Sequence, residues 1–163
     1  MSTTAETPLS HIDSTGRAVM VNVGGKLPTA REAHVEAAVV MSPQALAALQ
    51  QRALAKGDAA AVARAAGFLA AKRTAELIPL CHPIPIEHME LAIEPDEAAG
   101  AVRISCCMAA TAKTGVEMEA FTAVAVAALT LYDMIKAVDP AATITGLRLV
   151  SKTGGKQPYE RRS

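Results

Sequence analysis

Apolar and polar residues alternate with a period of two in two neighbouring stretches of the chain. The apolar positions are Met89, Leu91 and Ile93 in the first stretch and Val102, Ile104, Cys106 and Met108 in the second. Successive side chains of a strand point to opposite faces of a sheet, so this alternation is typical of half-buried strands. A turn-rich segment over 95–100 separates the stretches. The pattern therefore predicts two strands joined as a hairpin.

Two further strands are predicted, one over 143–150 and one over 31–41. The second is ambiguous, because REAHVEA suits a helix and VVM suits a strand; we favour a strand. A weak hairpin is expected around the Ser-Thr-Gly turn at 14–16.

Three segments carry helix signals. Ser42 followed by Pro43 opens a short helix. Asp58 can cap the next helix, which is expected over 59–77 and must end before the prolines that follow. The third, over 116–138, is apolar almost all round its middle, so it is expected to be buried on more than one side and suggests a subunit interface. Helices packed on a mostly antiparallel sheet make the predicted fold an α+β sandwich.

The length of 163 residues and an apolar content of 51% suit one domain with one core. We expect that domain over 11–156, with a flexible N-terminus over 1–10 and a flexible C-terminal tail over 157–163. Sixteen basic residues balance sixteen acidic ones, so no overall field would hold nucleic acid or an anionic membrane. Any phosphate binding must therefore be local.

Aromatic residues make up only 2% of the chain, which argues against stacking platforms for single-stranded nucleic acid. Three cysteines without a C-x-x-C spacing encode neither a disulfide framework nor a zinc ribbon. The first residues lack the apolar run of a secretory leader, and the apolar run over 120–132 is too short to span a bilayer. We expect a soluble, cytoplasmic protein.

The segment PLCHPIPIEHME over 79–90 holds a cysteine and two histidines between and after prolines. Metal ligation by Cys81, His82 and His88 is the weaker interpretation, because adjacent residues of an extended chain point in different directions and no ordinary zinc spacing is present. Pro83 favours extended backbone at His82, which suits a positioned acid, base or phosphate contact. A histidine bonded to a backbone carbonyl is an equally good interpretation.

The long helix is expected to carry carboxylates at its start. Thr114 and Glu117 fit a capping box, in which Glu117 returns a hydrogen bond to the Thr114 amide. Glu119 lies on a different side and needs water, a positive partner or a substrate. Both carboxylates gain from the helix dipole, so neither proves catalysis.

Asp133 and Lys136 share a face near the other end of the same helix. An ordinary ion pair explains them, and phosphate binding by Lys136 with Asp133 orienting it explains them equally well. Sixteen residues of helix separate Glu117 from Asp133, which is roughly 24 Å at the helical rise. If both ends are functional, they most simply meet through a symmetric partner.

The glycine-rich segment SKTGGK over 151–156 invites comparison with a phosphate-binding loop. It fails the Walker pattern, because Val150 and Gln157 stand where Gly and Ser or Thr are required. A lysine pair on a glycine loop can still clamp a polyphosphate, although we interpret Lys156 as part of a solvated tail. Lys113-Thr114-Gly115, at a predicted helix start, is another seat for an anion.

Taken together, LIPLCHP, KTGVEMEAFTAVAVAALTLYDMIKAV, AKGD and SKTGGK closely resemble the cyclic pyranopterin monophosphate synthases of early molybdenum-cofactor biosynthesis. The resemblance covers nearly everything from His11 to Lys156. It implies a ferredoxin-like α+β fold, a homohexamer built as a trimer of dimers, and active sites at subunit interfaces. It also implies conversion of a cyclic dihydro-GTP, supplied by a radical SAM enzyme, to cyclic pyranopterin monophosphate and pyrophosphate.

The resemblance also assigns roles to residues of this chain. The implied catalytic residues are Lys56, Asp133, Lys136 and His82. The implied substrate-binding residues are Arg31, Leu80, Cys81, His82, Glu117, Met118, Glu119 and Lys152. The sequence departs from the family pattern at Ala112, where Gly usually precedes Lys-Thr-Gly, which puts the shape of this loop in question.

The implied chemistry needs proton transfers and attack of a sugar hydroxyl on the α-phosphorus. Lysines and His82 can neutralise charge on the triphosphate, while Glu119, Asp133 or a lysine of lowered pKa can move protons. No redox cofactor or catalytic metal is required, although magnesium can accompany the triphosphate. Two other classes stay open: a regulatory module that binds a GTP-like ligand without releasing pyrophosphate, and a structural subunit that binds nothing. The many charged residues argue against the structural subunit.

Overall fold

The computed structural model describes residue 12 and residues 15–162, so the predicted flexible N-terminus over 1–10 lies outside the described residues. The described elements follow one another along the chain as β1 Thr29–Val40, α1 Pro43–Gln50, α2 Ala59–Lys72, α3 Thr74–Leu77, β2 His88–Asp96, β3 Ala101–Ala112, α4 Glu117–Ile135, β4 Thr143–Thr153 and β5 Tyr159–Glu160.

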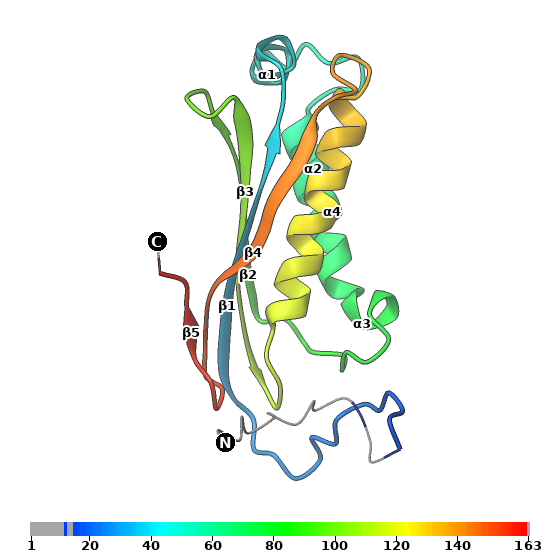
Figure 1. Ribbon diagram of the computed structural model, residues 1–163, viewed down its shortest axis with the longest axis vertical. Coiled ribbons are helices and arrows are strands. Elements are labelled where there is room, and N and C mark those ends of the chain that lie inside the picture. Colours follow the sequence, from blue (N-terminus) through cyan, green and yellow to red (C-terminus); the bar gives the residue numbers. More distant parts are fainter. Residues whose placement is uncertain (1–11, 13–14, 163) are drawn as a thin grey trace, which may run out of the picture.

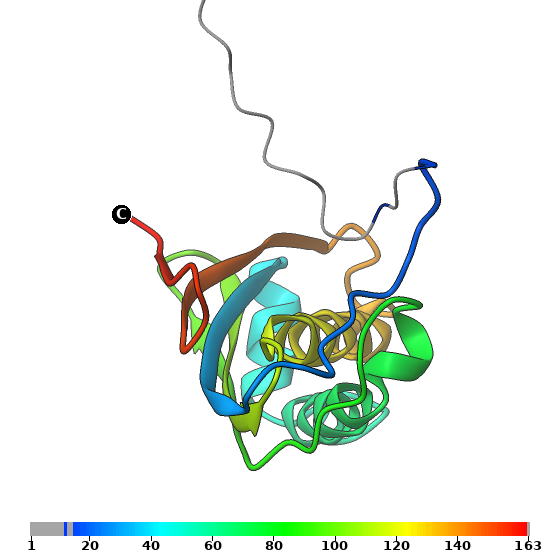
Figure 2. The same cartoon turned by 90° about the horizontal axis from the view of Figure 1, so that it is seen from below.

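The fold has two layers. The five described strands form one antiparallel sheet in the order β2-β3-β1-β4-β5. Helices α2 and α4 lie side by side on one face of this sheet, and the other face is left open (Figure 1, and from below in Figure 2). This arrangement confirms the predicted α+β, ferredoxin-like sandwich with helices on a mostly antiparallel sheet.

The β2–β3 hairpin forms as the alternation predicts. Its register places Met89 opposite Met108 and Ile93 opposite Ile104, so apolar residues of both strands share the face that the helices cover. Met108 and Ile104 are fully buried. Cross-strand apolar pairs on a covered face fix the register, because a slip of one residue would turn every one of them to solvent.

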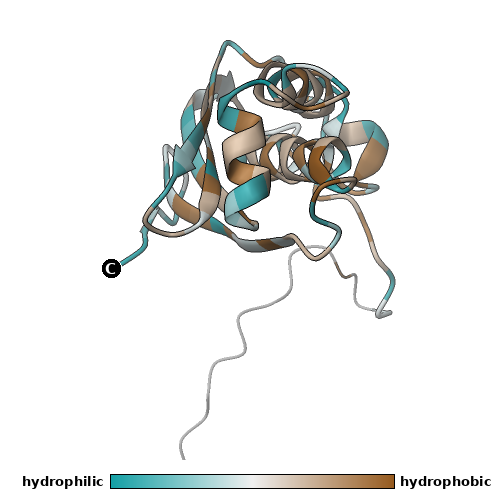
Figure 3. Cartoon of the chain, turned by 90° about the horizontal axis from the view of Figure 1, so that it is seen from above, coloured by the Kyte–Doolittle hydropathy of each residue, from teal (hydrophilic) through white to brown (hydrophobic). Residues whose placement is uncertain are grey.

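The ambiguous segment at 31–41 is a strand, and β1 extends from Thr29 to Val40. Its residues Ala33, Val35, Ala37 and Val39 are buried with strict alternation. The strand lies at the centre of the sheet between β3 and β4, so its backbone donors and acceptors are used on both sides. Figure 3, where the ribbon is coloured by residue hydropathy, shows that both the strands and the helices of the two layers carry hydrophobic residues.

Two of the helix caps that the sequence predicts are present in the structure. The Ser42 hydroxyl accepts from the Ala45 amide at 3.3 Å, and the Asp58 carboxylate accepts from the Ala61 amide at 3.0 Å. The predicted helix over 59–77 is wrong at its end, because α2 stops at Lys72 and a short α3 follows. At this break the buried Thr74 hydroxyl donates to the Ala71 carbonyl at 2.9 Å.

Helix α4 is the core helix of the domain. By length and composition it could span a membrane, but its apolar face packs against the sheet and against α2. Gly67 of α2 lets the two helices approach closely, because a side chain there would meet the Ala123 carbonyl and Ala127. Such packing is that of a buried helix in a soluble domain.

Two ends of the described chain differ in detail from the sequence pattern. The hairpin expected around 14–16 amounts to a single bridge between Ile12 and Ala18. Within the segment expected to be a flexible tail, Tyr159 and Glu160 form β5 beside β4, with Lys152 opposite Tyr159. The polar composition of the tail carries no signal for this pairing.

Candidate active site

A pocket of about 350 Å³ lies at the N-terminal end of α4. Its walls come from the 80–84 connector, from the start of α4 and from the segment before β1. Six residues assigned by the resemblance line it: Leu80, Cys81, His82, Glu117, Met118 and Glu119. The structure therefore brings together residues that are more than thirty positions apart in the sequence.

The connector that carries Cys81 and His82 is held at both ends. The Cys81 amide donates to the Ile78 carbonyl at 3.0 Å, which closes a turn after α3. At the far end the Glu87 carboxylate accepts from the Thr111 amide and hydroxyl, each at 3.1 Å. Prolines stiffen the chain between these points. His82 is thus a half-buried side chain on a fixed connector, as predicted.

Glu119 is the most unusual residue of this pocket. Only 3% of it is exposed, and its Oε2 atom has no hydrogen-bond partner among the described residues. Burial raises the pKa of its carboxyl above the usual value, with a further contribution from the charge of Glu117. A buried carboxyl that faces a cavity and has one oxygen without a hydrogen-bond partner is suited to a ligand or to proton transfer.

Cys81 lies beside this carboxyl and is half-buried. Burial raises the pKa of its thiol, and the charge of Glu119 raises it further. The thiol is therefore protonated at neutral pH and is not an activated nucleophile. It contributes a small, weakly polar surface to the pocket wall.

The predicted capping box at the start of α4 is wrong. The residue that caps the helix is Val116, and no side-chain hydrogen bond caps the N-terminus of this helix. The Glu117 carboxylate instead accepts from the Lys152 Nζ at 2.9 Å. This ion pair ties the start of α4 to the end of β4 and positions Lys152 beside the pocket.

A second, adjoining pocket of about 400 Å³ is strongly basic. Arg31 and Lys152, both assigned by the resemblance, line it. Three further lysines also line it, namely Lys26, Lys113 and Lys156. The two pockets share Lys26, Thr114, Gly115 and Glu117, so they form one continuous surface. This surface joins a carboxyl-lined hollow to a basic one.

The basic pocket depends on a close approach between two backbones. Gly154 has a φ of +80°, and a side chain there would collide with the Ala30 carbonyl. The Thr29 hydroxyl donates to the Gly154 carbonyl at 3.0 Å. Glycine therefore places the 152–156 loop directly against the start of β1, where Arg31 lies.

Sequence reasoning missed Lys26 and assigned Lys156 to a solvated tail. Both residues line the basic pocket. A signal for Lys26 was present, because Gly24-Gly25-Lys26 repeats the Gly-Gly-Lys of 154–156. Lys113 is positioned by donating to the Gly24 carbonyl at 2.9 Å.

The remaining catalytic candidates gather at the opposite end of α4. Asp133 accepts from Lys56 at 2.5 Å and from Lys136 at 2.6 Å, and Lys56 also donates to the Asp133 carbonyl at 2.8 Å. Hydrogen bonds from Lys136 and Lys56 lower the pKa of Asp133 to about 2. The pKa of Lys136 is raised by Asp133. All three side chains are about half exposed to solvent.

The structure does not bring the two ends of the predicted site together within one chain. Glu117 and Asp133 begin and nearly end the same unbroken helix, so about 24 Å of helical rise lies between them. Each group is locally assembled, and neither can reach the other.

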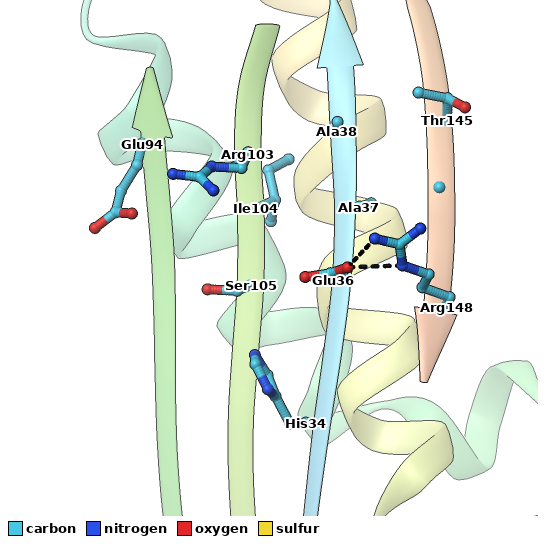
Figure 4. Close-up of a pocket in the computed structure, with 11 residues that line it drawn as sticks. His34, Glu36, Ala37, Ala38, Glu94, Arg103, Ile104, Ser105, Thr145 and Arg148 are labelled. Carbon is cyan, nitrogen blue, oxygen red and sulfur yellow. Dashed lines mark hydrogen bonds and ion pairs between the residues drawn. The ribbon is translucent and has the colours of Figure 1, made fainter. Parts of the chain in front are cut away.

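A larger hollow lies elsewhere, on the open face of the sheet (Figure 4). It has a volume of about 510 Å³ and is lined by His34, Arg103 and Ser105, among others. Its Glu36 carboxylate is already paired with the Arg148 guanidinium at 2.5 Å. It contains no residue assigned by the resemblance, and we do not take it for the active site.

Within the described residues, no three His, Cys, Asp or Glu side chains gather in a way that could hold a metal ion. Cys81 and His82 line the pocket without His88, which lies at the start of β2.

Comparison with known proteins assigns the chain to a protein family. The family model described as the MoaC family matches residues 20–155. Cyclic pyranopterin monophosphate synthase of Chloroflexus aggregans is 53% identical over 91% of this chain and 90% of its own length. The enzyme of that name from Methylobacterium nodulans is 49% identical over 91% and 92%. Cyclic pyranopterin monophosphate synthase 3 of Mycobacterium bovis is 51% identical over 94% and 86%.

Proposed function

The chain belongs to the MoaC family, and from that premise we propose that it is a lyase that makes cyclic pyranopterin monophosphate. Its substrate is (8S)-3',8-cyclo-7,8-dihydroguanosine 5'-triphosphate, supplied by a radical SAM enzyme, and its second product is pyrophosphate. The observation that carries this proposal is the continuous surface at the N-terminal end of α4. There a buried carboxyl and a histidine adjoin a cluster of five basic residues.

The basic pocket suits a triphosphate. Lys26, Arg31, Lys113, Lys152 and Lys156 converge on it in a chain whose overall charge is zero. Such a local concentration of positive charge stabilises the extra charge that develops on a departing pyrophosphate. Arg31 can bind two phosphate oxygens at once with its planar guanidinium.

The carboxyl-lined pocket suits the ring system derived from guanine. Opening and rearranging this ring needs proton transfers at nitrogen and carbon atoms. Burial raises the pKa of Glu119, which favours its protonated form and suits it to donating and accepting protons in this step. His82, on its stiff connector, is placed to share these transfers or to contact phosphate.

The phosphoryl step closes the cyclic phosphate. A sugar-derived hydroxyl oxygen bonds to the α-phosphorus, and the bond from that phosphorus to the bridging oxygen of the β-phosphate breaks. The hydroxyl proton passes to a base, and pyrophosphate leaves with the bonding electron pair. Lys56, Asp133 and Lys136 form the group that we assign to proton transfer and charge stabilisation in this sequence.

A complete site then needs two subunits, since this group is about 24 Å of helix away from Glu117. We propose a homohexamer built as a trimer of dimers, in which each site takes its pocket from one chain and its Lys56–Asp133–Lys136 group from a neighbour. The enzyme acts in the cytoplasm without nucleic acid or membrane. It requires no cofactor of its own, and magnesium can accompany the triphosphate.

The direct test is to incubate the protein with the cyclic dihydro-GTP and to measure pyrophosphate and the pterin product. Stoichiometric release of both supports the proposal. Binding of the substrate without pyrophosphate release would favour a regulatory module instead. Lys56→Ala and Lys136→Ala, checked for folding by circular dichroism, should each turn over far more slowly, and wild-type turnover would remove that residue from the catalytic group.

The sharing of sites between chains has its own test. Glu119→Gln and Lys136→Ala alter opposite ends of α4, so a mixed dimer of these variants contains one intact site. Random mixing after dissociation should restore about a quarter of wild-type activity, because half of the dimers are mixed and each has one good site of two. Lys56→Ala mixed with Lys136→Ala should restore none. Absence of restoration in both mixtures would contradict a shared site.

A further inference from the structure

The histidine of the candidate active site borders two hollows. His82 lines the carboxyl-lined pocket, and it also lines a separate cavity of about 360 Å³. The walls of this proline-lined cavity include Pro83 and Pro85 on one side and Thr111 on another. A side chain that borders two cavities has fewer packing partners than one inside a core. The position of His82 therefore depends on how the backbone of its connector is held.

The connector over 79–87 has little regular structure to hold it. Its residues from 81 onward belong to no helix or strand, and in Figure 1 they form the irregular segment between α3 and β2. Three of its nine residues are prolines. Proline restricts the backbone dihedral angles but removes the amide that would donate a hydrogen bond. The connector is thus locally stiff, while its place in the molecule is set by contacts at its ends.

Glu87 fixes the far end of the connector to β3. Its backbone amide donates to the Ala109 carbonyl at 3.2 Å. Its Oε2 atom accepts both from the amide and from the hydroxyl of Thr111, each at 3.1 Å. One residue therefore makes three hydrogen bonds to two positions of the same strand.

The Glu87 carboxylate takes the place of a strand partner. β2 begins at His88, opposite Ala109, whereas β3 continues to Ala112. Pro85 cannot donate to a ladder, so β2 cannot extend further toward the connector. The Thr111 amide lies in this unpaired part of β3, and a backbone donor needs an acceptor. Glu87 supplies that acceptor and, by the same contact, anchors the connector.

We propose that Glu87 is a positioning residue, whose contact with Thr111 sets where the connector places the imidazole of His82. The proposal rests on the function assigned above, in which His82 moves protons or contacts phosphate. Glu87 lines neither the carboxyl-lined pocket nor the basic one. It therefore acts through His82 and has no contact with the substrate.

The same end of β3 also supports the basic pocket. The Ala112 carbonyl accepts from the Arg31 Nε at 3.4 Å, and Lys113 follows directly in the chain. This strand end is held independently by β1, because Ala30 is paired with Thr111. Loss of the Glu87 contact should therefore loosen the connector and leave the phosphate contacts in place. His82 would then move relative to the basic residues, which is the kind of misplacement that lowers kcat.

The kinetic test is Glu87→Ala, checked for folding by circular dichroism. Its kcat for pyrophosphate release should fall by about 10- to 10²-fold, while KM should change by less than about twofold. Glu87→Gln keeps an acceptor oxygen on a side chain of the same shape, so its kcat should stay within about threefold of wild type. A kcat of Glu87→Ala equal to that of wild type would overturn the proposal. Equal losses in Glu87→Gln and Glu87→Ala would also overturn it, because the negative charge would then act directly.

The matched control is Asp96→Ala at the other end of β2. The Asp96 carboxylate likewise accepts from a backbone amide, that of Ala99 at 3.1 Å, and it pairs with Arg103. Asp96 lines none of the pockets described above. This variant should keep its kcat. A loss as large as that of Glu87→Ala would show that any anchor of β2 supports activity through the fold, and would overturn a specific role for Glu87.

A double variant separates positioning from general damage. In a His82→Ala background Glu87 has no imidazole to position, so adding Glu87→Ala should lower kcat by less than about twofold. The same fold-loss in both backgrounds would contradict action through His82. If Glu87→Ala does not fold, Thr111→Val is used in its place. Thr111→Val removes only the hydroxyl bond, and it should cost about threefold in wild type and nothing measurable in His82→Ala.

Chemical modification tests the position of His82 without measuring turnover. Diethyl pyrocarbonate modifies exposed histidines, and mass spectrometry gives the rate at each one. Relative to His34 on the open face of the sheet, the half-buried His82 should react at least about threefold faster in Glu87→Ala and unchanged in Asp96→Ala. An unchanged His82 rate in an active enzyme would remove the positioning role and leave the function standing. A faster rate in a protein that never releases pyrophosphate would leave the connector anchored by Glu87 and remove the function.

Discussion

The two ends of helix α4 are built on opposite principles. At the N-terminal end, Glu119 is buried and its Oε2 atom has no hydrogen-bond partner among the described residues, and burial raises the pKa values of both Glu119 and Cys81. At the C-terminal end, Asp133 has two lysine partners in half-exposed positions, and its pKa is lowered to about 2. Burial disfavours the charged form of the carboxyl at the N-terminal end, whereas the charges at the C-terminal end are paired and exposed to water.

This contrast shows what each end lacks. The buried end has a cavity and a carboxyl whose Oε2 atom has no hydrogen-bond partner among the described residues, and burial raises the pKa of that carboxyl. The exposed end has three charged side chains that are held by ion pairs. None of the three lines either of the two pockets described above. Groups whose pKa values are pushed apart make good acid and base partners once they share a site. We therefore propose that either end alone is an incomplete active site, which is the physical reason to expect a second subunit.

The largest effect is expected at the exposed end. Asp133→Asn removes the negative charge that holds both lysines, so kcat should fall by about 10²–10⁴-fold. The thermal unfolding temperature should change little, because exposed ion pairs add little to stability. Steady-state kinetics of pyrophosphate release and a melting curve measure the two effects.

The matched control for Asp133→Asn is Glu76→Gln. Glu76 forms an exposed pair with Arg73, also three residues away on a helix, and the pair lies outside the site. This variant should keep both its activity and its melting temperature. A similar loss of activity in the two variants would mean that exposed ion pairs in general support the fold, and that Asp133 has no special part in catalysis.

The next largest effect is expected at the buried end. Glu119→Gln keeps the shape of the side chain but cannot give up a proton, so turnover should fall by about 10²-fold. Because the folded pKa of Glu119 is raised, the folded state binds more protons than the unfolded state as the pH rises above the ordinary glutamate range. The wild type therefore loses stability as the pH rises through that window.

The Glu119→Gln variant should not lose stability as the pH rises through this window. Glu119→Gln is thus expected to melt at a higher temperature than wild type at pH 8, with a smaller difference at pH 4.5. Melting curves in the absence of substrate measure both values. A difference that grows toward low pH would show that the carboxylate is stabilised in the fold, and would break the contrast between the two ends.

A third prediction concerns the backbone that shapes the basic pocket. Gly154 and Gly146 both have positive φ, but only at Gly154 would a side chain collide with neighbouring backbone. An alanine costs conformational strain at either position. At Gly154 overpacking should add about 1–3 kcal/mol to the free-energy loss, and KM should rise because Arg31 and Lys152 move apart. Denaturant unfolding of both variants measures the difference, and equal losses would mean that the loop shifts freely.

Local sequence patterns predicted the parts of this fold whose information is local. The β2–β3 hairpin follows from alternation over one continuous stretch, and the caps at Ser42 and Asp58 follow from side chains that bond three residues ahead. The break between α2 and α3 could not be predicted in this way. Neither Gly nor Pro marks it, and the buried Thr74 hydroxyl bonds back into the preceding helix.

The site shows the same limit more sharply. Glu117 fitted a capping box, but it pairs with Lys152, which is 35 residues further along the chain. Lys26 was missed because only the fold brings the segment before β1 to the start of α4. The separation of Asp133 from Glu117, by contrast, was predictable, because the rise of a helix fixes distance from residue count alone.

The smallest effect is the most specific to the exposed end, and it concerns the pKa of Asp133. In the wild type, this carboxyl should stay ionised down to about pH 2, because Lys136 and Lys56 donate to it. Lys136→Met removes the larger of these contributions, so its pKa should rise toward the ordinary value of 3.8. Carboxyl carbon shifts followed by NMR between pH 6 and pH 2.5 should then show Asp133 titrating only in the Lys136→Met variant. Asp139 is an internal control, because the Ser42 amide lowers its pKa and Lys136 takes no part. If Asp133 titrates identically in both proteins, the lysines do not hold its charge and the two ends of α4 differ less than their geometry indicates.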